Sequence, residues 1–197
     1  MKDVVPADSK YVPLTQQKWL CVPTCIQIVM LRHNIPLIPA EVIGYNMNLL
    51  VPKRDAALFW KPRTGKKPKA GWGTQLKEKL SANKLFKKMG IPLKLDWILI
   101  DEFKDFDQFK KYLGRITNSD KDFFVCFDWG KMFGTSYVGG HVCVLDKVYV
   151  DKGEIRMIDP EYRAPKWRVV KTKKLYQAMK FHGKKNSAGF WNLSLIK

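Results

Sequence analysis

The amino-acid sequence predicts an α+β fold in which helices pack against an antiparallel β-sheet. Helical patterns dominate residues from about 16 to 117, and strand patterns dominate residues 122–197. This segregation is typical of α+β proteins. Two of the strands are separated only by the turn sequence Asp-Lys-Gly, which predicts an antiparallel hairpin. With 46% hydrophobic residues, the 197-residue chain can bury a core, so we expect one domain over residues 1–197 with a helical half and a sheet half.

The helical half is predicted to contain four helices, over residues 22–34, 39–50, 76–89 and 105–116. The first is apolar on nearly every side and is therefore expected to be buried all round. Pro23 suits its first turn, and Pro36 stops it. Asp105 and Gln108 form a plausible capping box at the start of the last helix. Residues 53–70 are rich in Lys, Arg, Pro and Gly without periodicity, which predicts a mobile surface loop.

Runs of β-branched and aromatic residues predict the strands. They are expected over residues 93–100, 123–129, 141–150, 154–158 and 189–196. A short helix is expected between the last two strands, capped by Thr172 and ending near Met179. Residues 1–15 lack a clear period and are expected to form an arm.

The chain is strongly basic, with 36 Lys and Arg against 18 Asp and Glu and a formal net charge of +18. Such a field attracts phosphates, anionic membranes or acidic proteins, and it also serves simple solubility. The segment 53–69 mixes basic residues with Phe59 and Trp60, so it could bind single-stranded nucleic acid through phosphate contacts and base stacking. A solvated, flexible loop near the cleft is the favoured interpretation. Trp72, between two glycines, could be a mobile wall of a cleft or a core anchor.

The N-terminus lacks the apolar core of a signal peptide, and no apolar run is long enough to cross a bilayer. A cytoplasmic protein is therefore expected. Four cysteines in a chain of this length do not make a disulfide framework. Cys126 and Cys143 lie in apolar strand patterns and are expected to be inert core thiols, and Cys25 is expected to pack in the core.

Three polar residues each occupy a boundary between predicted elements. Cys21 precedes the first helix, His141 follows a Gly-Gly pair and opens a strand, and Asp159 ends a strand just before a proline. A thiol reacts as the thiolate, which a helix N-terminus and a nearby imidazolium both favour. A carboxylate can hold the imidazole in the required tautomer. The sequence therefore indicates an enzyme with a cysteine nucleophile.

Acyl transfer also needs donors for the developing oxyanion. The backbone N–H of Cys21 can be one donor, and the side-chain amide of Gln16 or Gln17 can be the other. Because the register of the hairpin is not fixed by the sequence, Asp146 and Glu161 are alternatives to Asp159 as the group that orients the histidine. No second pair of Cys or His residues has ligand spacing, so no metal or cofactor is expected. His33, at the end of the first helix, suits a structural role, and His182 is expected to be solvated.

These residues, in this order, resemble the papain-like cysteine peptidase superfamily. Within it, the sequence is similar to the bacteriocin-processing peptidases of family 39, which remove double-glycine leaders, and to their free-standing look-alikes. The matching residues run from about Val12 to Pro160, although 34–121 is matched only by the order of its elements. The resemblance implies a papain-like fold whose central helix carries the nucleophile, and a peptide or protein substrate that is cleaved at a peptide or isopeptide bond.

By that resemblance Cys21 would be the nucleophile, His141 the general base and acid, Asp159 the orienting group and Gln16 the oxyanion-hole amide. The sequence departs from the family pattern in two places. Val22 stands where the family usually has glycine, which bears on substrate class, and Gln16 precedes Cys21 by five positions where six is common, which leaves the choice between Gln16 and Gln17 open. One alternative is an acyl or peptidyl transferase, like the phytochelatin-synthase branch of the superfamily. Another is a basic module that binds nucleic acid or an acidic protein and keeps only a vestigial site.

Overall fold

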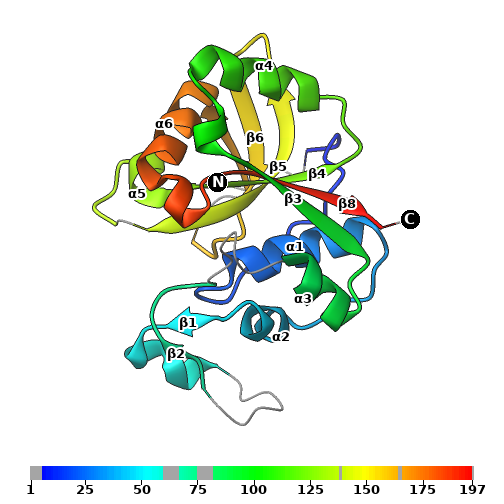
Figure 1. The fold of residues 1–197 in the computed structure, drawn as a ribbon, viewed down its shortest axis with the longest axis vertical. Helices are drawn as coiled ribbons and strands as arrows, with labels where there is room; N and C mark the ends of the chain where they lie inside the picture. Colours follow the sequence, from blue (N-terminus) through cyan, green and yellow to red (C-terminus); the bar gives the residue numbers. More distant parts are fainter. Residues whose placement is uncertain (1–5, 60–66, 75–81, 138, 164–165, 197) are drawn as a thin grey trace.

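A six-stranded antiparallel sheet with helices on both faces forms the centre of the protein, as seen in a computed structural model (Figure 1). The structure describes residues 6–59, 67–74, 82–137, 139–163 and 166–196. The strand order across the sheet is β3-β8-β4-β5-β6-β7. The strands are β3 (Leu93–Leu99), β4 (Asp122–Asp128), β5 (Gly140–Tyr149), β6 (Glu154–Ile158), β7 (Trp167–Lys171) and β8 (Gly189–Leu195). The α+β class expected from the sequence is confirmed.

Three helices from the first half of the chain lie on one side of the sheet; the first and third pack on its strands, and the second packs on the first. They are α1 (Cys21–Arg32), α2 (Ala40–Asn46) and α3 (Ala82–Met89). Cys25, Ile26 and Val29 of α1 pack with Phe124 and Val144 of the sheet, all fully buried. Eight of the twelve residues of α1 are buried, so the prediction of a helix buried on nearly every side is correct.

The opposite face is covered by α4 (Phe106–Ile116), α5 (Trp129–Phe133) and α6 (Thr172–His182). Leu175 and Met179 of α6 pack with Val125 and Phe190 of the sheet in a second core. The Asp105 side chain accepts the backbone N–H of Gln108 at the start of α4, 2.8 Å away. The predicted helix cap is therefore present. The sequence segment assigned to a helical half thus also supplies β3, and the segment assigned to a sheet half contains α5 and α6.

Several element predictions were wrong in detail. The second helix stops at Asn46 and is followed by β1 (Leu50–Val51), which pairs in parallel with β2 (Lys69–Ala70). Between them, residues Lys53–Leu58 form the 3-10 helix η1, so the described part of the predicted loop is partly ordered. The remaining short 3-10 helices are η2 (Ile100–Glu102) and η3 (Lys184–Asn186). The predicted helix over 76–89 is described only from residue 82 onward, and residues 60–66 of the basic segment lie outside the described residues.

The C-terminal half differs from the prediction in three places. Trp129 does not end a strand but opens α5, and β7 was not predicted at all. The last helix continues to His182. Thr172 does not cap it, because the N-cap is Lys171 and the Thr172 hydroxyl donates to the backbone oxygen of Gly153. The hairpin of β5 and β6 is confirmed, with Val144 opposite Ile158 and an irregularity between Leu145 and Lys147.

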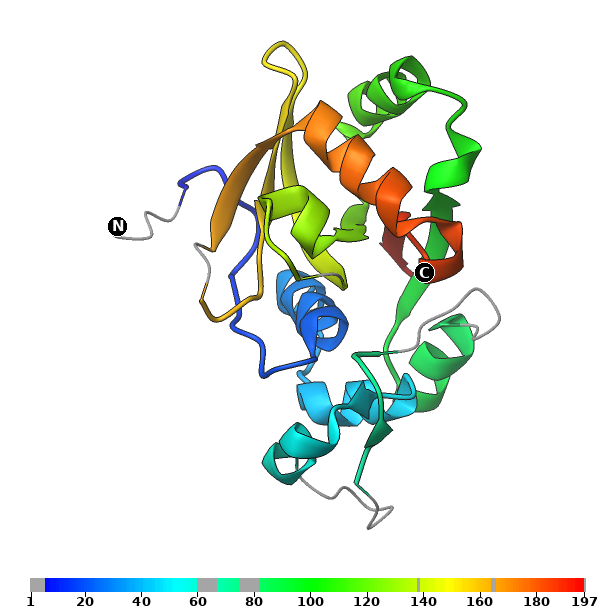
Figure 2. The ribbon, with the colours of Figure 1, turned by 90° about the vertical axis from the view of Figure 1, so that its left-hand side faces the viewer.

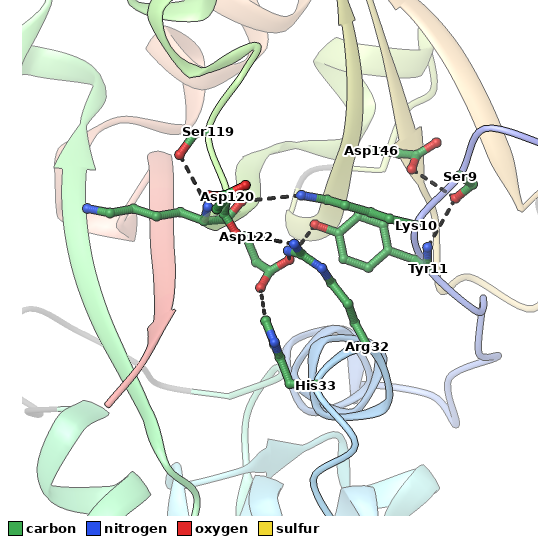
Figure 3. Close-up of polar contacts among 10 residues, drawn as sticks. Ser9, Lys10, Tyr11, Arg32, His33, Ser119, Asp120, Asp122 and Asp146 are labelled. Atoms are coloured by element: carbon green, nitrogen blue, oxygen red, sulfur yellow. Dashed lines mark hydrogen bonds and ion pairs between the residues drawn. The ribbon is translucent and has the colours of Figure 1, made fainter. Parts of the chain in front are cut away.

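A buried carboxylate at the start of β4 ties three parts of the chain together (Figure 3). Asp122 accepts the Tyr11 hydroxyl at 2.6 Å and His33 Nε2 at 2.7 Å, and it pairs with the Arg32 guanidinium. It therefore links the N-terminal arm, the end of α1 and the sheet. Burial of a charged carboxylate away from water is costly, and these hydrogen bonds and the ion pair offset that cost. None of the helices in the described part of the chain is both long and apolar enough to traverse a lipid bilayer.

The N-terminal arm also fixes the entry to α1. Figure 2 shows it running past the loop that follows β6 before it reaches the helix. The backbone N–H of Gln16 donates to the carbonyl oxygen of Pro160 over 2.8 Å. Farther up the arm, the Ser9 hydroxyl donates to Asp146 over 2.9 Å. The arm thus brings residues just before Cys21 beside the end of β6.

Candidate active site

Cys21 is the first residue of α1 and is partly exposed. Its backbone N–H is one of the first-turn donors of the helix, which have no partner inside the helix. The N-cap residue, Leu20, supplies no side-chain cap. The thiol lies at a cavity of about 910 Å³ that is also lined by Gln16, His141 and Glu161. The start of α1 thus combines the Cys21 sulfur, which lies at the cavity, with a backbone N–H that has no partner inside the helix.

The imidazole of His141 is held by a fully buried carboxylate. His141 is the second residue of β5, and Asp159 directly follows β6, the next strand of the sheet. His141 Nε2 lies 2.8 Å from Asp159 Oδ1. Asp159 also accepts the backbone N–H of Glu161 at 2.9 Å and Arg168 Nε at 2.7 Å. Three donors therefore surround this carboxylate.

These contacts decide the charge of both groups. Burial alone would raise the pKa of Asp159, but the hydrogen bond and charge of His141, with smaller contributions from Glu161 and Arg168, lower it below 3.8. Burial alone would lower the pKa of His141. The nearby sulfur of Cys143, the hydrogen bond with Asp159 and the nearby sulfur of Cys21 instead raise the pKa of His141 well above 6.5. The contact with the Asp159 carboxylate thus favours the protonated imidazolium form of His141.

Aromatic rings exclude water from the histidine. The Trp129 ring lies edge-on to the His141 ring, with ring centroids 4.7 Å apart. The Phe127 ring also lies edge-on to the His141 ring, with ring centroids 6.0 Å apart. The guanidinium of Arg168 lies over Phe133 at 4.3 Å and over Trp129 at 5.4 Å. Arg168 is therefore fixed by aromatic stacking as well as by its ion pair.

Cys143, two positions after His141 on β5, is a second thiol beside the imidazole. Ligand atoms of His141, Cys143 and Asp159 all lie within 4.8 Å of one another, so these three residues could contact one metal ion. The Asp159 oxygens, however, already accept the donors described above, and Arg168 places a positive charge there. Burial raises the pKa of Cys143 to about 12 and also raises the pKa of Cys25 and Cys126. All three cysteines other than Cys21 are thus buried thiols.

The structure separates the alternatives that the sequence left open. Gln16 lines the cavity, whereas Gln17 donates its amide to the backbone oxygen of Leu58, at an exposed position. Asp146 pairs with Arg156 Nε at 2.5 Å and accepts Ser9, so it is occupied elsewhere. Glu161 does lie at the site, but its backbone N–H bonds to Asp159 and its carboxylate bonds to Gln16. Asp159 is the carboxylate bonded to His141.

Two residues of the site were missed by sequence reasoning. His182 was expected to be solvated, but it is the partly buried last residue of α6 and lines the cavity. Burial lowers its pKa, against a smaller opposing effect of Asp128. Arg168 lies on the unpredicted strand β7. The alternation of Trp167, Arg168 and Val169 was the available signal for that strand.

One rim of the cavity carries a pair of tryptophans. Trp72 is 60% exposed and packs edge-to-face on Trp19, with ring centroids 5.1 Å apart. Of the two roles considered for Trp72, the position agrees with a cleft wall. Trp19 has a left-handed backbone with φ of 69°, which a large side chain rarely adopts. Its indole N–H donates to buried Asp55 over 3.0 Å, which holds the ring in place.

A central helix that begins at a cysteine packs on an antiparallel sheet, and a histidine on strand β5 lines the same cavity as that cysteine; this is a papain-like α+β fold. More particularly, the fold is similar to the crystal structure of a protein from Bacillus anthracis that is described as a proposed C39-like peptidase. The TM-score is 0.52 at 14% sequence identity, over 94% of this chain and 95% of the other. No protein-family model and no curated protein matches the sequence. At this identity the likeness establishes a common fold, in agreement with the resemblance seen in the sequence.

Proposed function

We propose that the protein is a cysteine peptidase that cleaves a peptide or isopeptide bond through a thioester intermediate. The observation that carries the proposal is the His141 ring, which bonds to the buried Asp159 carboxylate through Nε2 and lines the same cavity as Cys21. The C39-like fold supports the same class of activity.

In the proposed mechanism the Cys21 sulfur attacks the carbonyl carbon of the scissile bond. The carbonyl oxygen becomes an oxyanion, which the backbone N–H of Cys21 and the Gln16 amide stabilise. His141 donates its proton to the leaving amine, and because Nε2 faces Asp159, that proton is carried on Nδ1. The C–N bond breaks and a thioester remains. His141 then removes a proton from water, whose oxygen attacks the thioester carbonyl; the C–S bond breaks, the carboxylic acid leaves, and the Cys21 thiolate is regenerated beside the protonated His141.

A thiol-directed reagent tests the first step without knowledge of the substrate. We expect iodoacetamide to alkylate Cys21 at pH 7 on the order of ten times faster than free cysteine, because a paired thiolate is the reactive form. His141→Ala is expected to lower that rate to about the level of free cysteine. Mass spectrometry of the labelled protein identifies the modified residue.

The three buried cysteines provide an internal control, since raised pKa values and burial keep them unreactive in the folded protein. Cys21→Ala should therefore abolish native-state labelling. Labelling of Cys21 no faster than free cysteine would remove the proposed activity. A screen of peptide, ubiquitin-like and glutathione-type substrates against wild type and Cys21→Ala then identifies the substrate class.

Product analysis in the presence of added amines distinguishes hydrolysis from acyl or peptidyl transfer, because a transferase gives the amide product. The alternative of a basic binding module makes a separate prediction: affinity for nucleic acid that falls steeply with salt and survives Cys21→Ala. A gel shift in a salt series measures it.

A further inference from the structure

The side-chain amide of Gln16 has an uneven set of contacts. Its Nε2 donates to Glu161 Oε2 over 2.8 Å. Its Oε1 is buried and, within the described part of the chain, has no hydrogen-bond partner. A buried carbonyl oxygen without a partner costs about 1–3 kcal/mol. The amide is therefore held in this orientation by the contact at its nitrogen, not by any gain at its oxygen.

The chemistry of the partner explains that orientation. An ionised carboxylate only accepts hydrogen bonds. Rotation of the Gln16 amide by 180° would bring its Oε1 against the Glu161 oxygen, so that two acceptors would face each other. An amide nitrogen carries two hydrogens. One is used by Glu161, and the second is available to an oxygen in the cavity that Gln16 and Cys21 both line.

Glu161 is itself fixed by the segment 159–161. Its backbone N–H donates to Asp159 Oδ1, and its carbonyl oxygen accepts Lys166 Nζ at 3.1 Å. The backbone N–H of Gln16 donates to Pro160 within the same segment. This short segment therefore contacts both the carboxylate that holds His141 and the glutamine beside Cys21.

We propose that Glu161 is a positioning residue that orients the Gln16 amide toward the oxyanion, which rests on the function proposed above. Its negative charge also repels the oxyanion, so the two effects have opposite signs. Glu161 is partly exposed at the cavity, where water screens charge repulsion. The orienting effect is therefore expected to be the larger, and removal of Glu161 should slow acyl transfer.

Two reagents separate this effect from general reactivity. The Cys21 sulfur attacks the saturated carbon of iodoacetamide: a C–S bond forms, the C–I bond breaks and iodide leaves, without an oxyanion. p-Nitrophenyl acetate is attacked at its carbonyl: a C–S bond forms, the C–O bond breaks, p-nitrophenolate leaves and an acetyl thioester remains, by way of an oxyanion. In Glu161→Ala we expect acylation of Cys21 to fall about tenfold, a part of the 100-fold or greater loss typical of deleting an oxyanion donor. Alkylation should stay within about twofold of wild type.

Glu161→Gln is the matched control, because its side-chain oxygen can still accept the Gln16 N–H. It should keep acylation within about threefold of wild type. A double-mutant cycle supplies the second test. In a Gln16→Ala background, Glu161→Ala should cause no further loss of acylation, since its favourable effect acts through Gln16 and only the relief of charge repulsion, which raises the rate, remains.

Acylation that is unchanged or faster in Glu161→Ala overturns the proposal, as does an equal effect in the Gln16→Ala background. Parallel losses of acylation and alkylation, with a lower melting temperature, would assign Glu161 a purely structural role. Wild-type Cys21 that reacts like free cysteine with both reagents would instead refute the proposed function, so the two failures are distinguishable.

Discussion

Arg168→Met tests whether the cation behind the Asp159–His141 pair holds the site together. Arg168 Nε lies 2.7 Å from Asp159 Oδ2. The Asp159 side chain is fully buried, and the Arg168 side chain is 21% exposed. Methionine keeps much of the apolar stem that contacts Phe133 and removes the charge.

The expected loss of stability depends on the hydrogen bonds that the Asp159 carboxylate keeps in Arg168→Met. Breaking a buried ion pair costs about 3–5 kcal/mol, and a lost hydrogen bond to a charged group costs about 1.5–3 kcal/mol. Because His141 and the Glu161 N–H still bond to the carboxylate, we expect a loss of about 2–3 kcal/mol in the free energy of unfolding. For a chain of this length, each kcal/mol lowers the melting temperature by about 2–4 °C, so the total shift should be about 4–12 °C.

The loss should depend on pH in a defined direction. The pKa of Asp159 is lowered below 3.8, so the carboxylate contributes stability above about pH 4 that is lost as the pH falls through its lowered pKa. The difference in stability between Arg168→Met and wild type should therefore be full at pH 7 and shrink as the acid range is entered and the pH falls through the lowered pKa of Asp159. Thermal unfolding followed by circular dichroism across this range measures it.

Arg163→Met is the matched control, because Arg163 is exposed at the same cavity and stacks over Tyr162. The same change of charge there should alter the melting temperature by no more than about 2 °C. Equal shifts of the melting temperature for the two variants at pH 7 would refute the role of this ion pair.

Three further predictions follow from the same structure. In Gly130→Ala the new Cβ would lie 1.9 Å from a backbone oxygen of the next loop, so we expect the free energy of unfolding to fall by about 1–3 kcal/mol. Gly114 on α4 has open space around it, so Gly114→Ala should raise the free energy of unfolding by about 0.5–1 kcal/mol. Urea unfolding measures both changes. At pH 6.5 the His141 ring should be protonated and the His182 ring neutral, because their pKa values are shifted in opposite directions, and ¹⁵N chemical shifts of the ring nitrogens report this. Asp122→Asn should cost about 3 kcal/mol or more and release the N-terminal arm to limited proteolysis, since the ion pair with α1 is lost.

Each of these has a clear contrary result. Equal stability of the two glycine variants would mean that the loop after α5 moves freely aside. Matching ¹⁵N shifts for the two histidines would contradict the ion pair of His141 or the burial of His182. An Asp122→Asn protein with wild-type stability and an equally resistant arm would show that the cluster at β4 contributes nothing to folding.

Much of the fold could be predicted because it depends on local pattern. The run after Cys21 is apolar on nearly every side, so a helix formed from it is stable only when it is buried in the core. The turn residues after Tyr149 specify a hairpin. The strand β7 was missed because its exposed edge position gives only a short alternation of five residues. Trp129 was assigned to a strand because an aromatic residue continues the preceding apolar run; only the Asp128 side chain, which caps Lys131, marks the start of a helix.

The residues of the candidate site could be predicted from their positions at element boundaries. The residues that contact them could not be predicted in this way. The choice between Gln16 and Gln17 depends on which way the arm turns, and that is set by a backbone hydrogen bond to Pro160, far along the chain. His182 reaches the cavity because α6 is one turn longer than its sequence pattern suggests. Contacts of this kind join residues more than a hundred positions apart, and no local pattern encodes them.

The order of strands has a consequence for how the chain acquires its structure. β8 comes last among the strands in sequence, yet it lies between β3 and β4. Until it is synthesised, the two strands that it joins expose unpaired edges, which are prone to aggregate. During translation, α1 and the β5–β6 hairpin can form early, while β3 must wait for a partner nearly a hundred residues downstream. Such non-local pairing slows folding, so a nascent chain of this protein is expected to depend on chaperones until its final strand is in place.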